Sequence, residues 1–191
     1  MARIRKLLVA NRGEIAVRIM KTAKRLGIHT VAVYAENDYN TLHVHYADEA
    51  FPLGEGKLSD TYLNLDKLEN IIGQSEVDAV HPGYGFLSEN ENFARICEEN
   101  EVLFVGPSAY AIRMMGDKIK SREIAENAGI NISKGVTGSI DEVLSQKQEL
   151  TYPLLVKASA GGGGKGMRIV EDPKDFEEQM DRAVSEAKNA F

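Results

Sequence analysis

The sequence predicts an α/β protein in which a doubly wound parallel sheet is followed by a smaller α+β unit. Two observations support this fold class. Short apolar runs alternate with runs of helical periodicity over residues 4–106, as a parallel sheet requires. Near the other end, four consecutive glycines at 161–164 separate two short apolar runs, which is typical of a β-hairpin with a glycine tip. We therefore expect domains at 1–113 and 132–191, joined by a helical linker at 114–131.

The first domain begins with a β-α-β unit. Ile4–Ala10 and Thr30–Ala35 are apolar and strand-like, and the helix expected over Glu14–Leu26 carries apolar residues at helical spacing and ends at Gly27. Such a unit is expected to be parallel and right-handed. The elements expected after it are a helix at Leu65–Gly73, a strand at Val77–His81, a helix at Asn90–Glu99 and a strand at Val102–Gly106.

The second half is expected to be mixed. Two helices should meet near Met114–Lys118 and end at Gly129, and a short strand is expected within Ile130–Gly138. The remaining expected elements are a helix from the N-cap Ser139, with Glu142 at the third position, to about Leu150; hairpin strands at Tyr152–Lys157 and Met167–Val170; and a last helix capped by Asp172 with Pro173 in its first turn.

Composition places the chain among ordinary globular proteins. It has 191 residues, 43% hydrophobic and 27% charged, with a net charge of -6. This charge argues against general binding to nucleic acid or to an acidic membrane. No apolar run approaches the roughly 18 residues that a membrane span needs. The single cysteine, Cys97, lies in a helical pattern and is expected to be a buried thiol. We expect a cytoplasmic location, or the mitochondrial matrix in a eukaryote.

Two loops are expected at the carboxyl ends of the parallel strands, where such sheets bind ligands. One is Asn11–Glu14, and the other is His81–Asn90, which carries glycines together with His, Tyr, Ser and Glu side chains. The alternative is that the glycines of the second loop serve only its geometry and that Ser88 or Asn90 caps the next helix. His81 could be a base, but a hydrogen-bonded structural role is the commoner one.

The glycine-tipped hairpin predicts a phosphate grip. Backbone N–H groups at Gly161, Gly162, Gly163 and Gly164 could close around a polyanion, and Lys157 and Lys165 flank them. The dinucleotide fingerprint does not apply because a strand, rather than a helix, follows the loop. The P-loop pattern fails because Gly166 follows Lys165. The alternative is a flexible linker.

Other candidate residues are weaker. Lys118 lies at the expected helix junction and is otherwise a solvated side chain. His43 and His45 could share a strand face as metal ligands, but no third ligand has suitable spacing. We therefore predict no metal ligands in this chain.

Four motifs together resemble the biotin carboxylase family, the ATP-grasp component of biotin-dependent carboxylases. They are Ala10–Ala16, His81–Asn90, Met115–Lys118 and Lys157–Met167. The resemblance implies a Rossmann-like pre-ATP-grasp domain followed by an incomplete ATP-grasp lid subdomain. It covers the whole chain but roughly the first two fifths of such a component, so we expect a fragment that is inactive alone. The glycine motif looks more like acyl-CoA carboxylase α subunits, such as the propionyl-CoA type, than like pyruvate carboxylase.

The resemblance implies that Mg-ATP activates bicarbonate as carboxyphosphate and that biotin on a carrier domain is then carboxylated. It implies a nucleotide site at Lys118, Lys157, Gly161–Gly164 and Met167, and a bicarbonate and biotin side at Gly83, Tyr84 and Glu89. It also implies a dimer interface at Arg18 and Lys21. The Mg²⁺ ligands, the bicarbonate-binding arginine and the general base are expected outside this chain.

The expected partners are a biotin carboxyl carrier and a carboxyltransferase component, within a homodimer or larger assembly. Two other hypotheses stay open. One is an ATP-grasp ligase with an amine substrate, against which the His81–Asn90 loop argues. The other is a stand-alone binding or dimerisation module that does not use ATP.

Overall fold

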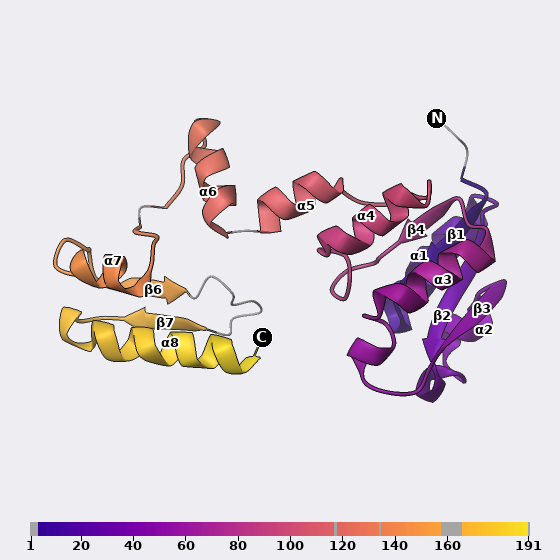
Figure 1. Cartoon of the computed structure of the whole chain (residues 1–191), viewed down its shortest axis with the longest axis horizontal. Coiled ribbons are helices and arrows are strands. Elements are labelled where there is room, and N and C mark those ends of the chain that lie inside the picture. Colours follow the sequence, from indigo (N-terminus) through magenta and orange to yellow (C-terminus); the bar gives the residue numbers. More distant parts are fainter. Residues whose placement is uncertain (1–3, 117, 134, 158–165, 191) are drawn as a thin grey trace. The chain divides into compact units, whose positions relative to one another are not determined.

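The computed structural model describes residues 4–116, 118–133, 135–157 and 166–190, and the chain divides into two compact units, Met1–Gly116 and Asp117–Phe191. Figure 1 shows the first unit as a sheet flanked by helices and the second as a hairpin lying along a long helix. No helix in these described ranges is long and apolar enough to cross a membrane.

The first unit is built on a parallel sheet of five strands in the order β3-β2-β1-β4-β5. The strands are β1 (Lys6–Val9), β2 (His29–Ala35), β3 (Glu49–Gly54), β4 (Ala79–His81) and β5 (Leu103–Phe104). This confirms the doubly wound parallel sheet. The strand order reverses between β1 and β4, so the loops that follow these two neighbours meet at the topological switch point.

Helices cover both faces of this sheet, and the apolar strands have a core on each side. The helices are α1 (Gly13–Arg25), α2 (Leu42–Tyr46), α3 (Leu65–Ser75), α4 (Glu91–Glu99) and α5 (Ala109–Gly116), with short 3-10 turns at Glu36–Asp38 and Leu58–Asp60. Leu8 packs with the residues of α3 and α4, whereas Leu7 and Val9 pack with α1. Alternate residues of β1 therefore serve opposite cores, as a strand covered on both faces requires.

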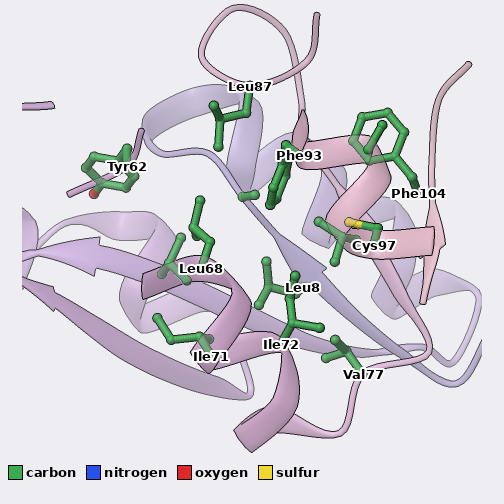
Figure 2. Packing of buried hydrophobic residues seen from close by; sticks show 14 of the residues in the cluster. Leu8, Tyr62, Leu68, Ile71, Ile72, Val77, Leu87, Phe93, Cys97 and Phe104 are labelled. Carbon is green, nitrogen blue, oxygen red and sulfur yellow. The ribbon is translucent and has the colours of Figure 1, made fainter. Parts of the chain in front are cut away.

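Figure 2 shows the larger of these cores, in which Leu8 and Leu68 lie among Ile71, Ile72 and Val77. Cys97 lies in the same cluster and is fully buried, which confirms its predicted position. Burial raises the pKa of this thiol to about 12, so it is protonated at neutral pH and acts as an apolar side chain.

The structure corrects three local predictions. His43 and His45 lie on α2 and not on a strand, and β3, which follows α2, was not predicted. Within 130–138, the described residues 130–133 and 135–138 form no strand. The helix that begins after Ser139 ends at Ser145, before the predicted Leu150.

The second unit comprises α6 (Lys118–Asn127), α7 (Ile140–Ser145), β6 (Leu154–Lys157), β7 (Met167–Val170), a 3-10 turn at Pro173–Asp175 and α8 (Phe176–Ala190). β6 and β7 pair in antiparallel register, as the hairpin prediction requires. The Ser139 hydroxyl and the Glu142 carboxylate form the predicted capping box. Phe176 and Met180 of α8 pack against Val170 and close the small core of this unit.

Asp48, which immediately precedes β3, bonds to residues of both β2 and α1. One of its carboxylate oxygens accepts hydrogen bonds from the Thr30 amide at 2.8 Å and the Thr30 hydroxyl at 2.7 Å, and the other pairs with Lys24 of α1 at 2.8 Å. Partial burial raises the pKa of this carboxyl group, but the bonds from Lys24 and Thr30 outweigh burial and lower the pKa to about 2.

The central strand should be sensitive to loss of volume. We expect Leu8→Ala to lower the free energy of unfolding by about 2–5 kcal/mol, because Leu8 is fully buried and its removal leaves a cavity. Leu103→Ala on edge strand β5, where the side chain is 55% exposed, is the matched control and should cost about 1 kcal/mol or less. Urea unfolding followed by circular dichroism measures both, and equal losses would contradict the assignment of the core.

Asp48 should contribute to acid stability. Its pKa in the folded chain lies below the unfolded value of about 3.9, so its contribution is present above that pH and is lost as the pH falls towards 2. We expect Asp48→Asn to flatten the pH dependence of the unfolding free energy in this window. Glu55→Gln, at an exposed residue, is the control. An unchanged slope for Asp48→Asn between pH 4 and pH 2 would show that the ion pair does not stabilise the fold.

Candidate functional site

The loops after β1 and β4 are joined by the side chain of Asn11. Its Nδ2 donates to the carbonyl oxygen of Pro82 at 2.8 Å and to that of Tyr84 at 2.9 Å, and its Oδ1 accepts from the Arg12 amide at 2.9 Å. The residue is 4% exposed. A buried amide that uses both N–H groups and its oxygen is fully satisfied and holds the second loop in one conformation.

Gly83 lies directly against this amide. Its φ is +71°, and a Cβ placed on it would lie 2.7 Å from Asn11 Nδ2. Its own amide donates to His81 Nδ1 at 3.0 Å. This bond occupies Nδ1 as an acceptor, and burial lowers the pKa of His81, so the geometry favours the structural role for this histidine.

Tyr84 projects from the loop towards solvent. Its side chain is 61% exposed, and its hydroxyl donates to Glu14 Oε1 at 2.9 Å. This hydrogen bond raises the pKa of the phenol. Glu89 is exposed on the same loop, and Asn90 is the N-cap of α4, where its oxygen accepts from the Phe93 amide. The sequence left Ser88 or Asn90 open as the cap, and the structure selects Asn90.

A second group of contacts holds the same loop through Phe86, which packs against Arg12 and Tyr62. The Arg12 guanidinium lies 5.3 Å from the Tyr62 ring centroid and 5.7 Å from that of Phe86, and its Nη1 pairs with Asp38 Oδ2 at 3.0 Å. Tyr62 donates to the same Asp38 oxygen at 2.7 Å. Burial raises the pKa of Asp38, but the bonds from Tyr62 and Arg12 outweigh it and leave the pKa below its ordinary value.

The hairpin of the second unit has one covered face and one open face. Leu154, Val156 and Val170 pack with α7 and α8. Because side chains alternate along a strand, the residues between them lie on the other face. There Leu155 pairs with Ile169 and Lys157 pairs with Met167, so three apolar side chains share a surface with one lysine. Leu155 is 43% exposed and Ile169 is 67% exposed.

The loop end of the hairpin is fastened to α8 on its covered side. Arg168 pairs with Glu186 Oε2 at 2.9 Å, and the Gly166 amide donates to the same oxygen at 3.4 Å. Gly166 has φ +72°, which a side chain would strain. These contacts hold the first residues that follow the glycine run.

The structure describes only part of the predicted nucleotide site. Lys157 is exposed at the end of β6, and Met167 is half-buried at the start of β7. Lys118 begins α6, but its side chain lies outside the described residues, as do Gly161, Gly162, Gly163, Gly164 and Lys165. Sequence reasoning missed Leu155 and Ile169. The continuous apolar run at 154–156 conceals the alternation that places Leu155 opposite the core.

Arg18 and Lys21 lie elsewhere on the first unit. With Arg25 they line an open groove of about 910 Å³ between α1 and α2, bordered by Leu42 and Tyr46. His43 lies at the base of this groove. It is 1% exposed and bonds to Thr41 Oγ1 and the Val33 carbonyl. No cluster of three or more His, Cys, Asp or Glu side chains suited to a metal occurs among the residues the structure describes.

Two family models match the chain, one over each unit. Residues 117–191 match the family model described as "Carbamoyl-phosphate synthase L chain, ATP binding domain", and solved structures similar to the chain have the ATP-grasp fold. Residues 3–112 match the model described as "Biotin carboxylase, N-terminal domain". The chain therefore belongs to the biotin carboxylase family.

Individual relatives agree with this assignment. Over 98% of its length the chain is 50% identical to pyruvate carboxylase and 48% identical to Biotin carboxylase 1, both of Bacillus subtilis. The biotin carboxylase domain dimer of the Hydrogenobacter thermophilus 2-oxoglutarate carboxylase, in complex with MgADP, ADP and bicarbonate, is 44% identical with a TM-score of 0.92 over 100% of this chain and 43% of its own. A biotin carboxylase of Campylobacter jejuni is 41% identical, with a TM-score of 0.93 over 99% of this chain and 43% of its own.

The chain spans only part of these relatives, 42% of Biotin carboxylase 1 and 17% of the pyruvate carboxylase. The propionyl-CoA carboxylase α chain of Ruegeria pomeroyi is 47% identical, close to the 50% of the pyruvate carboxylase. The acyl-CoA type therefore stays a prediction.

The contact between Gly83 and Asn11 can be tested by substitution. We expect Gly83→Ala to destabilise the chain by more than Gly85→Ala, because both positions have positive φ but only Gly83 has an atom within 4 Å of the added Cβ. Gly85→Ala should cost about 1 kcal/mol from backbone strain, and Gly83→Ala roughly 1–3 kcal/mol more. Chemical denaturation of both variants measures the difference between their unfolding free energies. In an Asn11→Ala background this difference should be smaller. Equal losses for the two alanines would refute the close contact.

Proposed function

We propose that this chain supplies the first part of a biotin carboxylase that uses Mg-ATP and bicarbonate to carboxylate biotin on a carrier domain. The observation that carries this proposal is the open face of the β6–β7 hairpin. Its exposed apolar residues are Leu155 and Ile169. Beside them lie Lys157 and Met167, the pair of residues next to the glycine loop.

This surface fits a nucleotide. A purine ring is flat and apolar on its faces, and Leu155 and Met167 offer contacts of matching character. Lys157 ends β6 just before the glycine loop, where a phosphate oxygen would satisfy its ammonium group. We assign the phosphates to the backbone N–H groups of Gly161–Gly164 and to Lys118. Bound Mg²⁺ would neutralise the charge of the phosphates.

The substrate side is assigned to the first unit. The Asn11 amide fixes the backbone around Gly83, which presents Tyr84 at the carboxyl edge of the sheet, and Glu89 is exposed on the same loop. Open α/β sheets bind ligands at this edge and at the switch point in strand order. We assign bicarbonate and biotin to this loop.

The proposed partners follow from the relatives. A biotin carboxyl carrier and a carboxyltransferase component would supply the biotin and take its carboxyl group. A homodimer is supported by the domain dimer of the Hydrogenobacter relative, and we assign Arg18 and Lys21 to that interface. A location in the cytoplasm or the mitochondrial matrix is proposed; the methylcrotonoyl-CoA carboxylase relatives of rat and mouse are mitochondrial proteins.

The test is a chimera in which residues 1–191 of this chain replace the matching region of Biotin carboxylase 1. We expect it to hydrolyse ATP in a manner that depends on bicarbonate and free biotin. Lys157→Ala should raise the KM for ATP by roughly 10-fold to 100-fold, because a charge-assisted hydrogen bond to phosphate is lost. Lys174→Ala, at an exposed lysine of the 3-10 turn Pro173–Asp175, is the matched control. A KM for ATP that stays the same in Lys157→Ala would remove the phosphate role of this lysine.

A further inference from the structure

Tyr84 is held at both ends, by Asn11 of the connection after β1 and by Glu14 in the first turn of α1. Its backbone carbonyl accepts from Asn11 Nδ2 at 2.9 Å, and its hydroxyl donates to Glu14 Oε1 at 2.9 Å. Tyr84 as a whole residue is 61% exposed. These two hydrogen bonds therefore position the phenol group while leaving it open to a ligand.

The bond to Glu14 also fixes what the phenol can offer to a ligand. A tyrosine hydroxyl has one O–H group to donate, and an ionised carboxylate can only accept. The O–H must therefore point to Glu14, and the oxygen of Tyr84 has only its lone pairs left for a ligand. A ligand that meets this oxygen has to bring a donor.

The charge of Glu14 reinforces this preference. The neighbouring Arg12 does not neutralise it, because its guanidinium pairs with Asp38 at 3.0 Å and packs on the rings of Tyr62 and Phe86. Among the described residues, no salt bridge reaches Glu14. An anion placed against the Tyr84 oxygen would face the negative charge of Glu14 at close range, which is unfavourable even near the protein surface.

We propose that Glu14 is a positioning residue that makes the Tyr84 hydroxyl a hydrogen-bond acceptor for an N–H group of a neutral ligand. This rests on the proposed function, within which that ligand is the ureido group of biotin and the bicarbonate anion lies elsewhere. Biotin and bicarbonate, both assigned above to the His81–Asn90 loop, would then bind at separate places.

The first experiment is a double-mutant cycle in the chimera. Tyr84→Phe removes the acceptor, so the KM for biotin should rise about 5-fold to 10-fold, while the KM values for bicarbonate and ATP should change by about twofold or less. Glu14→Ala should raise the KM for biotin about 3-fold alone and should have no further effect in the Tyr84→Phe background. Glu14→Gln should raise the KM for biotin by less than Glu14→Ala does, because the amide oxygen of glutamine can still accept the hydrogen bond from Tyr84.

The matched control is Glu55→Ala, at an exposed glutamate of the same unit, which should leave all three KM values unchanged. Two results would overturn the inference. One is an equal effect of Glu14→Ala in both backgrounds, since Glu14 would then not act through Tyr84. The other is a rise in the KM for bicarbonate, rather than for biotin, in Tyr84→Phe.

The second experiment needs no activity and uses the 191-residue chain itself. With ¹³C-labelled tyrosine, the NMR signal of Tyr84 is assigned by its loss in Tyr84→Phe. The hydrogen bond to Glu14 raises the pKa of this phenol, so Glu14→Gln should lower that pKa towards its ordinary value. An unchanged pKa would show that the pair does not form, and the inference would fail even if the chimera is an active carboxylase. A lowered pKa with a chimera that does not use biotin would leave the pair standing and overturn the biotin assignment together with the proposed function.

Discussion

The edge of the sheet that we assign to substrate depends on the buried side-chain amide of Asn11. The strand order brings the turn after β1 beside the loop after β4, and the amide closes the gap by donating to two carbonyl groups of that loop, those of Pro82 and Tyr84. Carbonyl groups withdrawn from solvent need partners, and β1 and β4 both end before this point. The close approach leaves no space for a Cβ on Gly83, so this position of the Asn11 amide requires a glycine at 83.

The two units present their proposed binding surfaces by different means. In the first unit the loop is braced from two sides, because the Arg12 guanidinium and the Tyr62 ring hold Phe86 at a φ of +44°, a conformation that a bulky residue rarely adopts. In the second unit, a two-stranded hairpin packs one face against α7 and α8 and leaves the other open. The first arrangement fixes individual side chains, and the second provides a flat apolar surface that suits a ring.

The sequence predicted the regular parts of this fold and the loops of the proposed site, because helical and strand periodicities are local signals. The segment between β2 and α3 was missed: α2 is only five residues long, and β3 contains Pro52, which weakens a strand pattern. The role of Asn11 could not be predicted, since its partners lie more than 70 residues away. Leu155 was missed because a run of three apolar residues does not show which of them faces away from the core.

The protection of the Asn11 side-chain N–H protons tests this account most directly. Hydrogen exchange of side-chain amides can be followed by NMR on the ¹⁵N-labelled chain, with the exposed Asn70 as an internal reference. The account predicts that both Asn11 protons exchange far more slowly than those of Asn70, because each is bonded to a carbonyl in a buried position. Exchange of Asn11 as fast as that of Asn70 would contradict it, since the two loops would then not be held together by this amide.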